Sequence, residues 1–119
     1  MSSTCDINEF LSTNLEDRQR SAENYLKNNP TKVPVLIINH HKSILLNQFK
    51  YLLSRELKVG RLVVMLKKMN SCSEEDAIYF YAGNKILRFD QTMQKVYEEH
   101  RSEDGFLYIR MTNLPTFGV

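Results

Sequence analysis

The sequence predicts an α+β fold with two N-terminal helices and a mixed four-stranded sheet. Three observations support this class. The first third of the chain is polar and has helical spacing, four short apolar runs follow, and two helical stripes separate the later runs. The 119 residues suffice for one domain and are too few for two ordinary ones.

Two helices are expected before the first strand. Asp6–Leu11 can form a short helical segment, and Leu15–Lys27 is the stronger pattern because Leu15, Ala22 and Leu26 share one face. Pro30 disfavours helix at the residue before it, so Asn28 and Asn29 should end the second helix.

The first two strands should pair as an antiparallel hairpin. Val33–Ile38 is apolar and β-branched, with Pro34 either near its start or on an exposed edge. Asn39–Ser43 turns the chain, and Phe49–Leu53 forms the second strand.

A helix and a third strand come next. Val59–Met69 carries a stripe at helical spacing that consists of Leu62, Val63, Leu66 and Met69. Ser73, three residues before Asp76, resembles a capping box and predicts one helical turn. Ala77–Tyr81 is the third strand, and Ala82–Asn84 turns the chain after it.

The last helix and strand complete the order. Either Asp90 or Thr92 can cap the helix, whose buried side should carry Met93, Val96 and Tyr97. Phe106–Met111 is apolar enough for a strand with both faces covered, in the middle of the sheet. Two helices followed by β-β-α-β-α-β are the ubiquitin-like β-grasp plan with an N-terminal extension. We divide the single domain into a helical extension (1–29), a β-grasp core (30–112) and a flexible C-terminal tail (113–119).

Composition narrows the classes of function. The net charge of +2 gives no reason to expect nucleic-acid binding. The N-terminus lacks the pattern of a secretory signal, and the apolar runs are too short to span a bilayer. We therefore expect a soluble intracellular protein whose membrane contact, if any, is acquired.

Residues with potential chemistry form no catalytic or metal-binding constellation. Cys5 and Cys72 fit no CxxC pattern and are interpreted as free thiols. His40 and His41 are adjacent and lack a third ligand nearby, so a surface loop is favoured over a metal site. We expect no enzyme and no cofactor.

Several short segments, taken together with their spacing, resemble the autophagy-related ubiquitin-like modifiers, the family of GABARAP and the yeast autophagy protein eight. The resemblance runs from about Leu15 to the end of the chain. The segments are Pro30–Val35, Lys50–Leu52, Val59–Gly60, Tyr97–Ile109 and Thr116–Gly118.

The resemblance implies a protein tag. In this family a cysteine protease exposes the C-terminal glycine, and activating and conjugating enzymes of the ubiquitin type carry it as a thioester. The glycine is then linked to phosphatidylethanolamine. The implied location is the cytoplasm and, after lipidation, the autophagosome membrane, where the tag recruits cargo receptors and adaptors. A monomer is expected in solution.

The tail fits this chemistry on physical grounds. Gly118 has no Cβ, so it can thread a narrow enzyme channel and leave its carbonyl carbon unhindered. Phe117 offers a protease an apolar handle, and Val119 must be removed first, which makes this sequence resemble a precursor. From the tail alone, an ordinary frayed terminus explains the same residues.

A second site is implied along Lys50–Leu53. In the family, a peptide with an aromatic residue, two spacers and an aliphatic residue adds to this strand by β-augmentation. The expected aromatic pocket uses Tyr25, Pro34, Leu36, Lys50, Leu52 and Phe106, and the expected aliphatic pocket uses Tyr51, Leu53, Leu57, Leu62 and Met65. Plain core packing is the alternative for these residues.

The sequence departs from the family around this groove. Lys32 keeps a cation beside the aromatic pocket, but Met69 and Gln48 stand where cations are common, so attraction to acidic flanks of the motif should weaken. Tyr25 is bulkier than the usual aliphatic residue, and Ser54 replaces a frequent proline.

Two further features bear on partners. Lys58 replaces a capping threonine at the start of the third helix. Residues 1–32 are nearly balanced in charge, so tubulin binding is not expected. The competing interpretation of the whole chain is a β-grasp adaptor that binds such motifs in vesicle traffic and is never conjugated.

Overall fold

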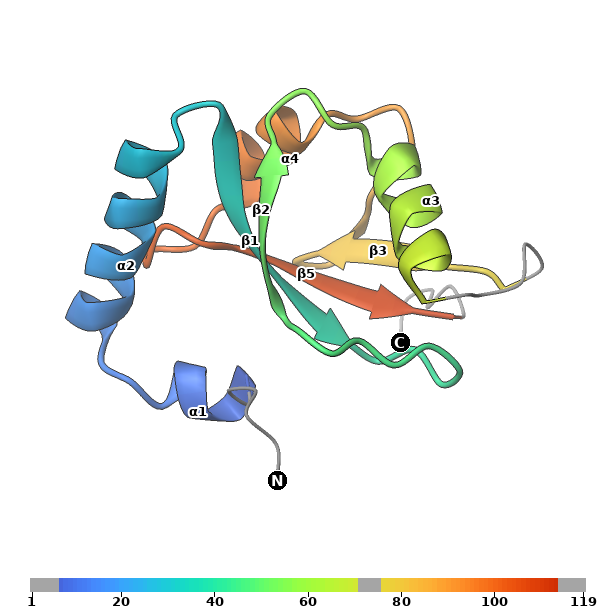
Figure 1. Ribbon diagram of the computed structural model, residues 1–119, viewed down its shortest axis with the longest axis horizontal. Helices are drawn as coiled ribbons and strands as arrows, with labels where there is room; N and C mark the ends of the chain where they lie inside the picture. Colours follow the sequence, from blue (N-terminus) through green and yellow to red (C-terminus); the bar gives the residue numbers. More distant parts are fainter. Residues whose placement is uncertain (1–6, 71–75, 114–119) are drawn as a thin grey trace.

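The computed structural model describes residues 7–70 and 76–113. Figure 1 shows its helices around a twisted central sheet. The elements in chain order are α1 (Ile7–Leu11), α2 (Leu15–Asn28), β1 (Lys32–Asn39), β2 (Lys50–Ser54), α3 (Val59–Met69), β3 (Tyr79–Ala82), β4 (Lys85–Ile86), α4 (Met93–His100) and β5 (Leu107–Thr112).

The sheet has the strand order β2-β1-β5-β3-β4. β1 and β2 are antiparallel, and β1 and β5 are parallel at the centre, with Val35 opposite Leu107. The ubiquitin-like α+β fold is confirmed, and so is the central place of the last strand. The predicted strand number was wrong, because the two residues of β4 pair with Tyr81 and Ala82. Two exposed residues are too few to produce an alternating pattern in the sequence.

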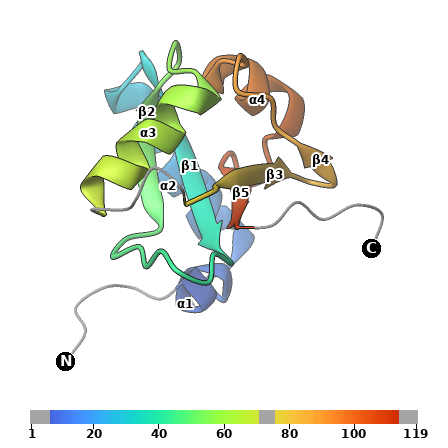
Figure 2. The same cartoon turned by 90° about the vertical axis from the view of Figure 1, so that its right-hand side faces the viewer.

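Helices cover both faces of the sheet. Figure 2 looks from the side of α3, with α2 behind the sheet. The larger core lies between the sheet and α3 and α4, and it includes Leu62, Leu66, Met93 and Val96. A smaller core on the side of α1 and α2 joins Phe10, Ala22, Leu36 and Phe106.

The helix boundaries follow local capping chemistry. The Asn14 side chain accepts a hydrogen bond from the Asp17 N–H at 2.8 Å at the start of α2. Thr92, rather than Asp90, is the N-cap of α4, where its Oγ1 accepts from the Lys95 N–H at 3.2 Å. Lys58 occupies the N-cap of α3 without a side-chain capping bond.

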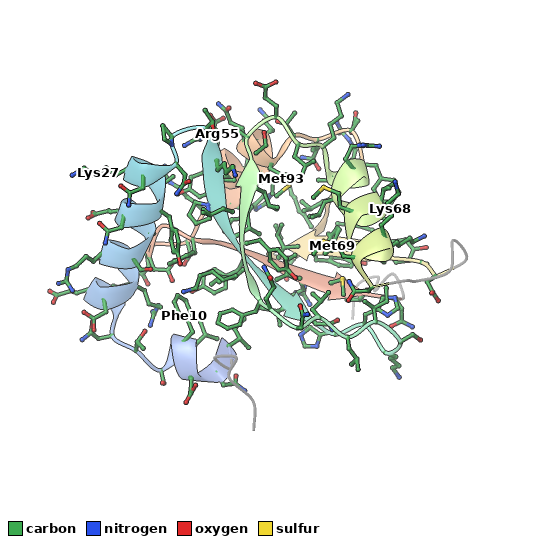
Figure 3. All side chains as sticks on the ribbon, viewed as in Figure 1. Phe10, Lys27, Arg55, Lys68, Met69 and Met93 are labelled. Atoms are coloured by element: carbon green, nitrogen blue, oxygen red, sulfur yellow. The ribbon has the colours of Figure 1, made fainter. Side chains whose placement is uncertain are left out.

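One residue of the predicted α3 stripe was placed wrongly. Leu62, Val63 and Leu66 are buried, but Met69 at the last turn is 61% exposed (Figure 3). The helix ends there, and most of that side chain is left exposed. The helical turn predicted at Ser73 lies outside the described residues.

His41 does not lie on the surface as predicted. Its side chain is buried, and Nδ1 accepts hydrogen bonds from the backbone N–H groups of Ser43 and Ile44, each at 3.1 Å. Nε2 lies 2.8 Å from the Ala77 carbonyl, which can only accept, so Nε2 carries the proton. His41 therefore joins the β1–β2 connection to the chain just before β3.

Candidate functional site

β2 is an outer strand of the sheet and pairs with β1 along one side. Pro34, which has no N–H, lies opposite Leu52, whereas the Ile37 N–H donates to the Phe49 carbonyl at 2.8 Å. Bonded and non-bonded pairs alternate in an antiparallel ladder. The backbone N–H and C=O groups of Lys50 and Leu52 therefore point away from β1, where another strand can pair with them.

Gln48 partly covers this outer edge. Its side-chain amide donates a hydrogen bond to the Lys50 carbonyl at 3.0 Å. A peptide strand that uses the same carbonyl replaces this exposed side-chain bond. The outer edge of β2 is therefore accessible, although the Gln48 side chain would compete with a peptide for the Lys50 carbonyl.

A cavity of about 180 Å³ lies beside β2. Its lining residues are Tyr25, Pro34, Lys50, Tyr51 and Leu52. Four of these belong to the expected aromatic pocket, and Tyr51 was expected in the aliphatic one. The structure therefore gathers four members of the expected aromatic pocket around one cavity, and their use in binding stays a prediction. Lys32 is exposed at the start of β1, opposite Ser54.

The two remaining residues of the expected aromatic pocket lie deeper. Leu36 and Phe106 are each 0% exposed and belong to the smaller core. Tyr25 packs against this core, with its ring centroid 6.2 Å from that of Phe106. The deep wall of the pocket is therefore covered in this structure.

Phe10 provides that cover, and the sequence analysis did not single it out. Its ring meets Phe106 edge-to-face at 5.3 Å between centroids and lies 5.9 Å from Phe49. The Lys50 ammonium lies 4.7 Å from the Phe10 centroid and 5.6 Å from that of Tyr25. Figure 3 shows Phe10 projecting from α1 toward the sheet. The available signal was a large aromatic residue between Ile7 and Leu11 in a short helical segment.

The expected aliphatic pocket lies on the other face of β2. Tyr51, Leu53 and Leu62 are buried in the larger core, and Leu57 packs against that core. Met65 on α3 is the most accessible member, at 39% exposed. Core packing therefore accounts for three of these five residues, and their role in binding is untested.

An ion-pair network fastens α2 to the loop before β5. The buried Asp104 carboxylate accepts from Arg18 Nε at 3.1 Å, from the Tyr108 hydroxyl at 2.5 Å and from the Phe106 N–H at 2.9 Å. Burial and, to a smaller extent, the hydrogen bond and charge of the Asp104 carboxylate raise the pKa of Tyr108 well above its ordinary value. Arg18 also donates to the carbonyls of Leu11 and Thr13, so the network reaches the end of α1.

A larger open cavity, of about 750 Å³, lies between β4 and α4. Its charged lining is mostly paired within itself, since Arg88 bonds Asp90 at 3.1 Å and Lys95 lies 3.6 Å from Glu99. This cavity is far from β2 in the strand order and shares no lining residue with the cavity there.

Residues expected at the C-terminal site, Phe117, Gly118 and Val119, lie outside the described part of the chain, as do Cys5 and Cys72. Within residues 7–70 and 76–113, no three His, Cys, Asp or Glu side chains are grouped to hold a metal ion. The helices of that same part are all too short or too polar to cross a bilayer.

The fold and the open edge of β2 define a ubiquitin-like domain. Residues 17–118 match the family model described as "Autophagy protein Atg8 ubiquitin like". The chain therefore belongs to the Atg8 family, whose members are ubiquitin-like modifiers of autophagy and not enzymes.

Relatives and a solved structure agree with this assignment. The chain is 35% identical over 107 residues to "Autophagy-related protein 8d" of Arabidopsis thaliana, covering 88% of this chain and 89% of that protein. It is 33% identical over 111 residues to "Autophagy-related protein 8e" of the same plant, covering 92% and 91%. The crystal structure of Trypanosoma brucei ATG8 superposes with a TM-score of 0.79 at 29% identity, covering 91% of this chain and 95% of that one.

Proposed function

We propose that this protein is cleaved after Gly118 and conjugated through that residue to phosphatidylethanolamine on autophagosomal membranes. There it recruits cargo receptors and adaptors that carry aromatic-x-x-aliphatic motifs. The observation that carries the proposal is the open edge of β2 with a cavity beside it, in a chain that matches the family through residue 118.

The groove supports binding of an extended peptide. The outward backbone groups of Lys50 and Leu52 offer hydrogen bonds that do not depend on peptide sequence, and the adjacent cavity offers selection of a side chain. Burying each of two apolar anchors is worth roughly 1.5–3 kcal/mol, and association costs offset much of this. Single-site affinity should be modest and should rise when many copies on one membrane meet a multivalent receptor.

The chemistry at the tail consists of successive acyl transfers. A protease hydrolyses the Gly118–Val119 bond, and ATP-dependent adenylation activates the new carboxylate. Enzyme thiolates then carry the glycyl group as a thioester. The amine of phosphatidylethanolamine attacks the thioester carbonyl, an amide forms, and the thiol leaves.

Conjugation would supply a membrane anchor. A single fatty chain gives only marginal binding, whereas phosphatidylethanolamine carries two chains. The modified protein should therefore remain anchored until the amide is cleaved.

The conjugation proposal is tested by the intact mass of the protein recovered from membranes of starved cells. We expect a species that lacks Val119 and carries a phospholipid on Gly118. The Gly118→Ala variant should stay in the cytosol, whereas a chain ending at Gly118 should be conjugated without the protease. Recovery from membranes only as the unmodified chain would reject conjugation and leave the adaptor function.

The groove is tested with a synthetic peptide that has acidic residues followed by Trp-x-x-Leu. Leu52→Ala should weaken binding fivefold or more, or about 1 kcal/mol, because part of an apolar contact is lost. Leu45→Ala is the matched control, since that leucine is 81% exposed in the β1–β2 connection. Equal affinities of the two variants would contradict the groove.

A further inference from the structure

We infer that Phe10 is an internal ligand of the aromatic pocket, so that a partner's aromatic side chain must displace α1 before it reaches Phe106. The inference rests on the proposed peptide-binding function and concerns its regulation. It is carried by the position of one ring, the small space that remains open in the pocket and the shortness of α1.

The Phe10 ring lies where the deep wall of the pocket would receive a ligand. It contacts Phe106 edge-to-face at 5.3 Å, and it shares one buried cluster with Leu36. Both of those residues are 0% exposed. An entering ring therefore cannot touch them while Phe10 stays in place.

The space that remains open is small. The cavity beside β2 has about 180 Å³, below the roughly 300 Å³ at the lower end for ligand pockets. Its lining comes from Tyr25 and from residues of β1 and β2, and it includes neither Leu36 nor Phe106. The accessible part of the pocket is therefore shallow, because the two deep residues do not line it.

Lys50 can make a cation–π contact with the Phe10 ring or with the aromatic ring of an incoming peptide. Its ammonium lies over the rings of Phe10, Tyr25 and Phe106, at 4.7, 5.6 and 6.0 Å from their centroids. A cation in this place attracts the face of an aromatic ring. A peptide tryptophan that replaced Phe10 would recover this attraction and the contact with Phe106.

α1 is held in a way that permits displacement. It has five residues, and Phe10 is its one buried residue. A helix this short is unstable by itself, so its docking depends on contacts with the rest of the domain, and the buried Phe10 ring makes the apolar part of them. Arg18 donates to the carbonyls of Leu11 and Thr13, which fixes the following connection to α2. The ring can therefore leave the pocket while the rest of the chain keeps its place.

Displacement lowers the apparent affinity for every peptide that needs the deep pocket. The apparent dissociation constant is the intrinsic one divided by the fraction of open molecules. Minor states of this kind are populated at roughly 0.1–10%. Removing the ring should then tighten peptide binding by about tenfold or more.

The first test compares full-length variants with the acidic Trp-x-x-Leu peptide by titration calorimetry. Phe10→Ala should bind about tenfold or more tightly than the wild type. Leu11→Ala is the matched control, because it is the next residue of the same helix and its side chain is 42% exposed; its affinity should equal that of the wild type. If Phe10→Ala binds as weakly as the wild type or more weakly, Phe10 is a wall of the pocket and the inference is overturned.

The second test does not depend on the stability of the Phe10→Ala variant. With 4-fluorophenylalanine at position 10, the fluorine resonance should move to its solvent-exposed value as the peptide saturates the protein. A resonance that keeps its buried value at saturation overturns the inference and leaves the groove intact. Failure of both the wild type and Phe10→Ala to bind the peptide would instead overturn the groove, and the internal ligand with it.

Discussion

Removing the Asp104 carboxylate should destabilise the fold strongly, and the structure sets the magnitude. Asp104→Ala deletes an acceptor that is 2% exposed and bonded to Arg18, Tyr108 and the Phe106 N–H. Breaking one side of a buried ion pair costs about 3–5 kcal/mol, because the partner charge is left uncompensated. That is a large part of the 5–15 kcal/mol typical of a whole domain, and for this size it corresponds to a fall in Tm of roughly 12–20 °C.

Thermal unfolding followed by far-UV circular dichroism measures this loss. Glu103→Ala is the matched control, because that neighbour is exposed and Gln19 bonds its backbone carbonyl rather than its carboxylate. The control should stay within about 0.5 kcal/mol of the wild type. A loss below about 1 kcal/mol for Asp104→Ala would show that the network is relaxed by water or by a new partner of Arg18, and would refute the reasoning.

Four further substitutions test other contacts. Burial and Asp104 raise the pKa of Tyr108 in the folded protein. The neutral Tyr108 side chain therefore contributes its full stabilisation below the ordinary tyrosine pKa of about 10. That contribution is lost as pH rises from there through the higher pKa of the folded state. Urea unfolding between about pH 9 and 11 should therefore show a smaller alkaline loss in Tyr108→Phe than in the wild type; equal slopes would contradict this. Gly105 has φ +89°, and an added Cβ would lie 2.8 Å from the Ala22 Cβ, so Gly105→Ala should cost about 1–3 kcal/mol in the same unfolding assay. Gly83→Ala, with φ +62° and no atom within 4 Å, should cost less, and the reverse ranking would reject the clash with Ala22. Lys58→Thr should stabilise by about 1 kcal/mol by adding the missing cap of α3, and an unchanged denaturation midpoint would count against that cap.

Much of the fold could be predicted because local and tertiary signals agree. Leu15 and Val59 begin helices where the sequence predicted them, and Thr92 caps α4 with the hydrogen bond expected of a threonine. Pro34 was compatible with a strand near its start, and the ladder explains why: its missing N–H falls at a non-bonded position opposite Leu52.

The features that sequence patterns missed depend on contacts between distant segments. Met69 continues the α3 stripe but lies at the end of the helix and is mostly exposed, so periodicity alone overestimates its burial. His41 belongs to a polar loop, yet it is buried because its ring satisfies two backbone donors and the Ala77 carbonyl. No local pattern specifies such partners.

The residues of the candidate site likewise include some that the sequence predicted and one that it missed. Tyr25, Pro34, Lys50 and Leu52 do lie around one cavity, as the resemblance implied. Phe10 was missed because its place in the pocket depends on how α1 docks, and five residues carry too little periodicity to predict that docking. The binding roles of all these residues stay predictions.

The parallel pairing of β1 and β5 has a mechanical consequence. Under the proposed function, with the chain anchored through Gly118 and a peptide paired with β2, tension would pass from β5 across β1 to β2. These three strands are neighbours, so the pull acts along their length and loads many backbone hydrogen bonds at the same time. This path does not include β3, β4 or the helices. Force applied by a receptor bound at β2 would therefore act on the paired strands β2, β1 and β5.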